Sequence, residues 1–341
     1  MKKIRFLLFP FTLIYDLVTR IRNLFFDFGI FKQTSFKIPV IVVGNLSVGG
    51  TGKTPQIEYL IRLLQNDFKT SVLSRGYKRK TKGFILLNNT HTATEVGDEP
   101  LQYFKKFNKI SVAVDEDRVH GVKQLLAQKK PDVVLLDDAY QHRKVKGSFY
   151  ILLTKYQDLF IDDFLLPTGN LRENRAGANR STVILITKCP LDLAVKEQQI
   201  IRKRFAQFNK QIFFTGISYG TLVLGDKEFA VNELESYNVL LVTGIANPKP
   251  LVNYLDGLQV NFKHLVYSDH HHFSETDILA IQNQFQEIKS SKKIILTTEK
   301  DYVRLKGSIE NLSYLPIKTS FLNDQSLIFN ALIDAHLKEN N

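Results

Sequence analysis

Short β-branched runs alternate with helical stretches along most of the chain, and this rhythm predicts the fold. Up to residue 187 we expect strands at Ile38–Gly44, Thr70–Ser74, Ile110–Val114, Asp132–Leu136, Phe149–Leu153 and Thr182–Thr187. Amphipathic segments such as Pro55–Gln65 and Arg118–Gln128 lie between several of them and predict helices. This strand–helix order favours an α/β fold with a mostly parallel sheet that helices cover on both faces.

The rhythm breaks near residue 211 and then resumes on a smaller scale. Residues 211–235 carry aromatic and aliphatic residues around Gly216 and Gly220, which predicts two strands that form a hinge or linker. A second series follows, with strands at Asn238–Thr243, Phe262–Val266 and Lys292–Leu296 and a helix near Asp277–Ile288. We therefore predict an N-terminal segment (1–36), a larger α/β domain (37–210), the linker (211–235) and a smaller α/β domain (236–341) that closes a cleft.

The segment 1–36 differs in composition from the rest of the chain. It holds eight of the 25 phenylalanines and six Lys or Arg residues, against only Asp16 and Asp27. Its apolar run, Phe6–Tyr15, is too short to span a bilayer. Mixed aromatics and cations suit the headgroup layer of an anionic membrane, although a helix that packs its Phe face on the domain would look similar. The sequence leaves open whether this segment is one helix or two, broken around Pro10 and Gly29.

Composition narrows the class of partner. The chain of 341 residues has a net charge of +12, which suggests an anionic partner such as nucleic acid, acidic lipid or a phosphorylated substrate. Cys189 is the single cysteine, so the chain forms neither an intrachain disulfide nor a cysteine-based zinc cluster. A reducing, cytoplasmic setting is the simplest fit.

The strongest chemical signal is the glycine-rich segment Gly44–Thr54, between a predicted strand and a predicted helix. It matches the phosphate-binding P-loop pattern except that Ser47 replaces the first glycine. Such a loop lets backbone N–H groups approach phosphate oxygens, so we predict ATP binding by a P-loop NTPase-like domain. The predicted nucleotide contacts are Ser47, Val48, Gly49, Gly50, Thr51, Gly52, Lys53 and Thr54. Lys53 would reach the β- and γ-phosphates, and Thr54 would bind Mg²⁺.

An apolar strand that ends in carboxylates supplies the expected metal-binding partner of this loop. Val133–Asp138 fits this pattern, and either Asp137 or Asp138 would hold Mg²⁺, directly or through water. A helix cap after a strand is the alternative explanation for these acids.

Three further segments carry unusual residues. Gly97–Pro100 opens a helix with two acids, which a helix N-terminus alone would favour. Ser268–Phe273 contains three consecutive histidines; tandem side chains diverge, so we favour a His beside an Asp over a metal site. Phe164–Glu173 predicts an ordered loop near the nucleotide.

Taken in order, these motifs resemble the tetraacyldisaccharide 4′-kinase family, the LpxK family. The resemblance covers roughly residues 38–305 and rests on Gly44–Pro55, Ser74–Tyr77, Gly97–Pro100, Leu135–His142, Leu165–Glu173, Asp269-His270 and Thr298–Asp301. It implies ATP-dependent phosphorylation of the 4′-hydroxyl of a tetraacyl disaccharide 1-phosphate at the cytoplasmic face of the bacterial inner membrane. A peripheral enzyme of lipid A synthesis, with no nucleic-acid partner and no stable protein partner, follows from it.

The resemblance also implies roles for individual residues. Asp98 would be the catalytic base, and His270 of the Asp-His motif would pair with it. His271 matches the family pattern, whereas His272 is extra. Arg172 and Glu173 would lie near the nucleotide.

The substrate contacts are less defined. Arg118, Arg75, Tyr77 and Gln141 are candidates for binding the sugar or its phosphate. A surface ion pair of Arg118 and a turn shaped by Arg75 and Tyr77 are the structural alternatives, and the segment around Gln141 fits a structural role as well. Two other functions stay open: a membrane-surface ATPase switch, in which hydrolysis is only a timer, and a nucleic-acid-binding NTPase.

Overall fold

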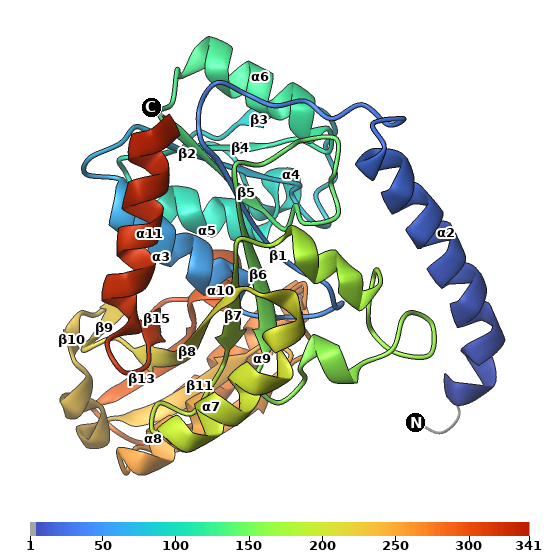
Figure 1. Cartoon of the computed structure of the whole chain (residues 1–341). Coiled ribbons are helices and arrows are strands. Elements are labelled where there is room, and N and C mark those ends of the chain that lie inside the picture. The colour runs from blue at the N-terminus through green and yellow to red at the C-terminus, as the bar shows by residue number, and fades with distance from the viewer. Residues whose placement is uncertain (1–4, 270, 341) are drawn as a thin grey trace.

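The computed structural model describes residues 5–269 and 271–340, which form two sheets with helices packed on them (Figure 1). The strands are β1 (Val40–Asn45), β2 (Thr70–Ser74), β3 (Ile85–Leu86), β4 (Ser111–Val114), β5 (Val133–Asp137), β6 (Phe149–Lys155), β7 (Val183–Thr187), β8 (Gln211–Tyr219), β9 (Leu222–Gly225), β10 (Phe229–Ala230), β11 (Asn238–Thr243), β12 (Asn261–Val266), β13 (Lys293–Thr298), β14 (Leu312–Leu315) and β15 (Ile317–Phe321). The α-helices are α2 (Phe9–Asp27), α3 (Lys53–Leu64), α4 (Ala93–Val96), α5 (Asp98–Lys106), α6 (Arg118–Gln128), α7 (Val195–Arg204), α8 (Lys249–Gly257), α9 (Glu275–Gln286), α10 (Glu299–Leu305) and α11 (Gln325–Asn340). Short 3₁₀ turns are η1 (Phe6–Leu8), η2 (Phe160–Asp162), η3 (Arg175–Arg180), η4 (Ala206–Phe208) and η5 (Val231–Ser236).

The larger sheet has nine strands in the order β15-β8-β7-β6-β1-β5-β2-β4-β3. Its inner strands pair in parallel, and only the edge strands β15 and β3 are antiparallel to their neighbours. The predicted fold class and strand positions are thus confirmed, with ends that differ by one or two residues. The central strands β1, β2, β5 and β7 are buried at every position, as continuous apolar runs in a covered parallel sheet should be.

Helices cover both faces of this sheet. One face packs against α3, α5 and α11, whose apolar side chains interleave with β1, β2, β4 and β5. The opposite face packs against α6 near β1 and β5, and against α7 with the adjoining 3₁₀ turns near β6 and β7. The carboxyl ends of the parallel strands therefore form one edge, where ligand sites of open α/β sheets are found.

The smaller sheet has six strands in the order β10-β9-β14-β13-β11-β12. Helix α8 packs on one face of it, whereas α9 and α10 pack on the other. Ser274 caps α9 through a hydrogen bond from the backbone of Asp277, as the capping-box sequence indicated.

The chain returns to the larger sheet at its C-terminal end, which differs from the predicted division. β8 and β15 pair with each other in the larger sheet, and Phe329, Ile333 and Leu337 of α11 are buried in its core. We therefore propose that residues 317–340 belong to the larger domain and that 222–315 form the smaller one. An amphipathic helix reveals which of its faces is apolar but not which sheet that face will meet, and the sequence therefore placed residues 317–340 in the smaller domain.

A buried charge cluster joins the two sheets. Lys106 at the end of α5 donates to Glu58 of α3 at 2.7 Å and also pairs with Glu299 at the start of α10. The second carboxylate oxygen of Glu299 accepts the backbone N–H of Ile317 at 3.2 Å. Three helices from both parts of the molecule thus meet at one satisfied ionic network.

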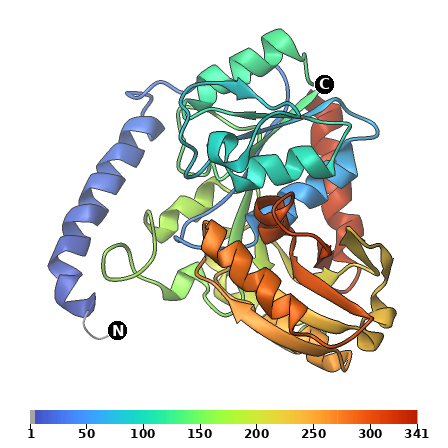
Figure 2. The ribbon, with the colours of Figure 1, turned by 180° about the vertical axis from the view of Figure 1, so that it is seen from behind.

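The N-terminal segment contains one long helix, which answers the question of whether Pro10 breaks it. Pro10 occupies the first turn of α2, where a missing N–H costs nothing, and Gly29 takes a left-handed φ of 73° just after the helix. Figures 1 and 2 show α2 lying along one side of the molecule. Within the described residues no helix is long and apolar enough to cross a membrane.

Candidate active site

The P-loop lies at the carboxyl end of β1, as predicted. Gly49 and Gly52 adopt positive φ angles of 100° and 86°, conformations that a side chain would strain, and α3 begins directly at Lys53. The Asn45 side chain bridges the two ends of the loop. Its amide donates to the carbonyl of Ser47, and its oxygen accepts a hydrogen bond from Lys53 Nζ at 3.1 Å. The loop is thereby held with a lysine at the mouth of a helix N-terminus.

Asp138 lies between two cations at this edge. Its carboxylate is 3.5 Å from Lys53 Nζ and 3.3 Å from Arg172 Nη1. Burial alone would raise the pKa of Asp138, but Lys53 and Arg172 outweigh it and hold that pKa below the usual value. Sequence reasoning placed all three residues at the nucleotide, and the structure brings them together.

Asp137 has a different environment from its neighbour. It is almost fully buried, and burial, followed by the charges of Asp138 and Glu99, raises its pKa to about 7. Ser74 donates to its Oδ2 at 3.2 Å, whereas Oδ1 has no hydrogen-bond partner among the described residues. A buried carboxylate oxygen without a partner beside a second carboxylate fits a divalent cation.

Thr54 lies near the same acid. The hydroxyl of Tyr103, on α5, donates to Asp137 Oδ2 at 3.4 Å and also meets the side chain of Thr54. The three predicted metal ligands Thr54, Asp137 and Asp138 thus gather at the carboxyl ends of β1 and β5. No cluster of three or more His, Cys, Asp or Glu residues suited to a metal is found in the part of the chain that the structure describes.

The loop at 164–173 lies against the P-loop. Val48 N donates to the carbonyl of Asn170 at 2.8 Å, and Arg172 N donates to that of Leu46 at 2.7 Å. Two short backbone bonds thus fix Arg172 beside Asp138, which accounts for the ordered loop that the sequence predicted.

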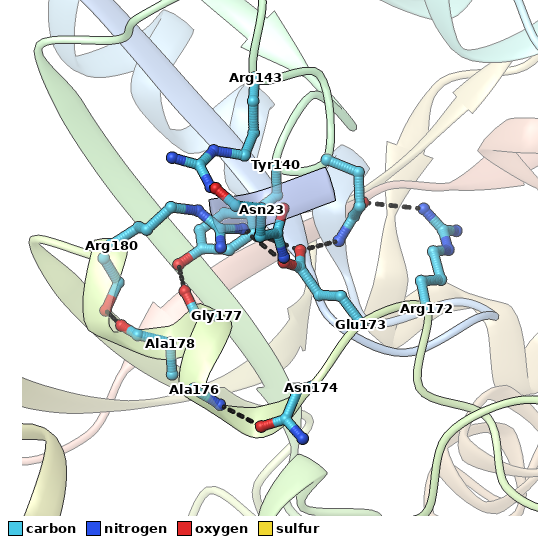
Figure 3. Close-up of polar contacts among 12 residues, drawn as sticks. Asn23, Tyr140, Arg143, Arg172, Glu173, Asn174, Ala176, Gly177, Ala178 and Arg180 are labelled. Carbon is cyan, nitrogen blue, oxygen red and sulfur yellow. Dashed lines mark hydrogen bonds and ion pairs between the residues drawn. The ribbon is translucent and has the colours of Figure 1, made fainter. Parts of the chain in front are cut away.

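Glu173 faces a different set of partners from Arg172. Its carboxylate pairs with Arg180 at 2.8 Å and accepts the side-chain amides of Asn23 and Gln141, each at 3.1 Å. In Figure 3 its side chain points toward Asn23, and that of Arg172 lies to the other side. The carboxylate is buried, so within this structure Glu173 joins α2 to the loop, and its contact with nucleotide stays a prediction.

Asp98 opens α5 immediately after Gly97, whose φ of 91° turns the chain into the helix. Gly97 also packs tightly against Gly76, since an added Cβ would approach the Gly76 backbone to 3.1 Å. The carboxylate of Asp98 forms an ion pair with Arg304 of α10. The predicted base is therefore held at the boundary between the two sheets.

The histidine segment is described in part. His270, the predicted partner of Asp98, lies outside the described residues. His271 Nε2 lies 3.0 Å from Asp277 Oδ2. Hydrogen bonds from Ser274, and to a lesser extent from His271, lower the pKa of Asp277 to about 2. His272 is exposed. His271 is thus engaged by the start of α9.

The predicted substrate residues differ in how far they are exposed. Arg75 and Tyr77 are exposed after β2, whereas Arg118 is buried at the start of α6. Arg118 donates to the carbonyl of Asp115 at 2.7 Å, and its Nε and Nη2 have no hydrogen-bond partner among the described residues. Burial lowers the pKa of Arg118 to about 10, which leaves the guanidinium charged at neutral pH.

Gln141 is committed to internal contacts. Its amide donates to the carbonyl of Asn45 at 2.8 Å and to Glu173, and its oxygen lies 3.5 Å from Arg172 Nη1. The amide thus connects the end of β1 to the 164–173 loop. Its predicted contact with substrate stays a prediction.

Several residues that shape the site were not predicted from the sequence. Asn45, Arg180 and Arg304 contact Lys53, Glu173 and Asp98, respectively. Asn45 follows a buried strand directly and precedes the glycine-rich loop, and that position was the available signal. The partners of Arg180 and Arg304 depend on tertiary contacts that the local pattern does not reveal.

A P-loop joins β1 to α3, two adjacent acids lie at the end of β5, and a further acid opens α5. Together these features define a P-loop phosphotransferase. The sequence profile of the family described as LpxK, tetraacyldisaccharide-1-P 4′-kinase, matches residues 4–338. The chain belongs to this family, as its motifs predicted.

Named relatives agree with this assignment. A tetraacyldisaccharide 4′-kinase of Flavobacterium johnsoniae is 53% identical, with 100% of this chain and 99% of that protein aligned. One from Bacteroides thetaiotaomicron is 44% identical over 99% of this chain and 94% of its own length. The crystal structure of LpxK from Aquifex aeolicus in complex with ATP superposes with a TM-score of 0.78 at 30% identity, covering 98% of this chain and 99% of that one.

Proposed function

We propose that this protein transfers the γ-phosphate of ATP to the 4′-hydroxyl of a tetraacyl disaccharide 1-phosphate, giving lipid IVA in lipid A synthesis. The observation that carries the proposal is family membership over nearly the whole chain, together with a P-loop whose Lys53 is held beside Asp138. The enzyme is a phosphotransferase with an alcohol group as acceptor. The alternatives of a membrane-surface switch and a nucleic-acid-binding NTPase are not favoured by the family match.

In the proposed step the 4′-oxygen forms a bond to the γ-phosphorus as the bridging oxygen between the β- and γ-phosphorus atoms leaves with ADP. The hydroxyl proton passes to the carboxylate of Asp98. A carboxylate is a weak base for a sugar hydroxyl, but it can take the proton late, once bonding to phosphorus has acidified the oxygen. His270 is the proposed partner of Asp98 in this step.

The phosphates would lie across the P-loop backbone between Ser47 and Thr54. Lys53 would neutralise the β- and γ-oxygens, and Arg172 would approach from the 164–173 loop. Thr54, Asp137 and Asp138 would hold Mg²⁺, which when bound neutralises charge on the transferring phosphate. The buried Oδ1 of Asp137, which lacks a partner among the described residues, supports this site.

The acceptor would enter from the side of α2. A cavity of about 710 Å³ lies there between α2 and the start of α6, and its walls combine Phe26, Ile30 and Phe31 with Arg22, Lys32 and Arg118. Apolar rings beside cations suit an acylated, phosphorylated sugar. The two buried guanidinium nitrogens of Arg118 that lack partners among the described residues would gain an anionic or hydroxyl ligand.

Helix α2 would hold the enzyme on the anionic cytoplasmic face of the inner membrane. Its exposed apolar side chains are Phe9, Phe11, Leu13, Ile14, Leu17, Val18, Ile21, Leu24 and Phe25, and only Thr12 and Phe26 of the helix are buried. An apolar patch of this extent is typical of an interaction surface and not of a helix that faces only water. Arg20 and Arg22 add positive charge to it. An acylated substrate that stays in the bilayer would then meet the site at the interface.

The test is phosphate transfer from ATP labelled at the γ-position to tetraacyl disaccharide 1-phosphate in mixed micelles. We expect a doubly phosphorylated lipid, and no labelled lipid from an acceptor that lacks the 4′-hydroxyl. Lipid-stimulated ATP hydrolysis without labelled lipid would instead indicate a membrane-surface switch.

A further inference from the structure

The start of α10, in the segment Thr298–Asp301, faces the start of α5. Lys300 and Arg304 are four residues apart, so they lie on one face of α10. That face meets Glu99 and Asp98, the two acids that open α5: Lys300 Nζ is 3.8 Å from Glu99, and Arg304 forms an ion pair with Asp98. Two cations of α10, a helix that packs on the smaller sheet, therefore contact the two acids that open α5.

Arg304 is itself held from the other side. Its Nη1 lies 3.2 Å from Asp301, whose side chain is fully buried. Asp301 in turn accepts the backbone N–H of Gly244 at 2.9 Å and the hydroxyl of Thr298 at 2.8 Å. The guanidinium is thus anchored to the ends of β11 and β13, and its position follows that of the smaller sheet.

The contact between Arg304 and Asp98 is suited to control the protonation state of the Asp98 carboxylate. The Asp98 and Arg304 side chains are mostly buried, with 18% and 9% of their surfaces exposed, so water screens their attraction weakly. Among the described residues, the other charged groups around the pair are Glu99 of α5, Asp301 and Lys300 of α10, and Asp269 after β12, which lies 3.6 Å from Lys300. Glu99 and Asp301 would each favour protonation of a neighbouring acid, and Arg304, which pairs with Asp98, opposes this effect.

We infer that Arg304 is a positioning residue for phosphoryl transfer, which holds the Asp98 carboxylate ionised and aimed at the acceptor and couples it to the smaller sheet. The inference rests on the proposed function, in which Asp98 receives the hydroxyl proton. It assigns the Thr298–Asp301 segment a task, which is to build the anchor that fixes the guanidinium.

The test compares full-length wild type with Arg304→Gln and Arg304→Lys in the lipid phosphorylation assay between pH 5.5 and 9. Lys306→Gln is the matched control, because Lys306 is an exposed cation directly after the same helix. For Arg304→Gln we expect the acid limb of the pH profile of kcat/KM for lipid to move to higher pH by about one unit. We expect kcat at pH 7 to fall at least about 10-fold, while ATP affinity by calorimetry stays within about two-fold.

Arg304→Lys keeps a charge but not the two-sided fork of a guanidinium, so its acid limb should stay near that of wild type with an intermediate kcat. An unchanged acid limb in a folded Arg304→Gln protein, or a loss confined to ATP affinity, overturns the inference. If Arg304→Gln does not fold, a wild-type kcat in Arg304→Lys overturns it as well. A wild type that phosphorylates no lipid contradicts the proposed function itself, and a wild type that does so while the variants match it contradicts only the role of Arg304.

Discussion

Asp138 and Asp137 are adjacent in the chain, yet the protein pushes their pKa values in opposite directions. Lys53 and Arg172 stabilise the anionic form of Asp138, whereas Asp137 is buried beside two other acids and its pKa rises to about 7. One acid is thus prepared as a fixed anion, and the other becomes a strong ligand once a cation offsets its burial. The sequence could not decide between them, because their difference lies in what surrounds each side chain.

The first residue-scale prediction concerns Lys53. Replacing it with Met removes the cation that faces both Asp138 and the phosphates, so we expect kcat for lipid phosphorylation to fall about 100-fold or more. Lys196→Met, an exposed lysine on α7, is the control and should be unaffected. Steady-state kinetics on both variants makes the comparison, and comparable losses in the two would refute a specific role for Lys53.

The second residue-scale prediction is that Asp137 makes the folding stability depend on pH. The folded pKa of about 7 lies above the value near 4 of an unfolded Asp, so between these values the folded state keeps a proton that the unfolded state releases. Stability without Mg²⁺ should therefore decline as pH rises from about 4 to 7.

Asp137→Asn has no such proton, so its free energy of unfolding should decline less over this range. Urea denaturation at pH 5, 6, 7 and 8 measures the effect, with the exposed Asp256→Asn on α8 as control. Parallel pH profiles for wild type and Asp137→Asn would show that Asp137 titrates in the ordinary range.

At the scale of elements, α2 has two different faces. Its outer face is apolar and exposed, and its inner face is bound to the 164–173 loop. Thr12 bonds the hydroxyl of Thr168 at 2.7 Å, Tyr15 donates to the carbonyl of Arg172 at 2.8 Å, and Asn23 donates to Glu173. Deleting the helix would remove partners of the loop that carries Arg172, so a truncation cannot separate membrane binding from the active site.

Point substitutions on the outer face make that separation. Leu13→Gln with Leu17→Gln should weaken binding to anionic vesicles by about 10-fold or more, since each leucine loses apolar area that would enter the bilayer. ATP affinity should not change. The matched pair Leu327→Gln with Ile328→Gln alters apolar residues on α11 that are also more than half exposed, and it should bind like wild type in flotation assays. Equal vesicle binding by all three proteins would disprove the interfacial role of α2.

The elements with the clearest periodicity could be predicted from sequence, and those defined by partners could not. The buried strand β2 and helix α6 have the ends that the pattern indicated, because apolar runs and amphipathic spacing are local properties. The pairing of β15 with β8 joins residues about a hundred positions apart, and no local signal encodes it. At the site, the P-loop and its acids were evident from order and spacing, whereas Arg304 depends on how two sheets meet.

At the scale of the whole molecule, the proposed base lies where the two sheets meet, so their relative position should matter for catalysis. We predict that the smaller sheet closes on the P-loop domain when ATP binds, which brings His270 together with Asp98 and Lys53 and excludes water from the site. Dyes on cysteines introduced at Lys123 of α6 and Asn283 of α9 would report this by energy transfer, because the native Cys189 is buried. Transfer efficiency should rise with a non-hydrolysable ATP analogue and stay unchanged with AMP. Equal efficiencies with both nucleotides would contradict closure.

The most direct test of the account is single-turnover phosphate transfer to tetraacyl disaccharide 1-phosphate by wild type, Asp98→Asn and Glu99→Gln. Both substitutions remove one carboxylate from the start of α5 with little change in shape, and only Asp98 is the proposed base. We expect a doubly phosphorylated lipid from wild type and Glu99→Gln, with the rate of Asp98→Asn at least about 100-fold lower at similar ATP affinity. An Asp98→Asn enzyme that transfers phosphate at the wild-type rate would contradict it.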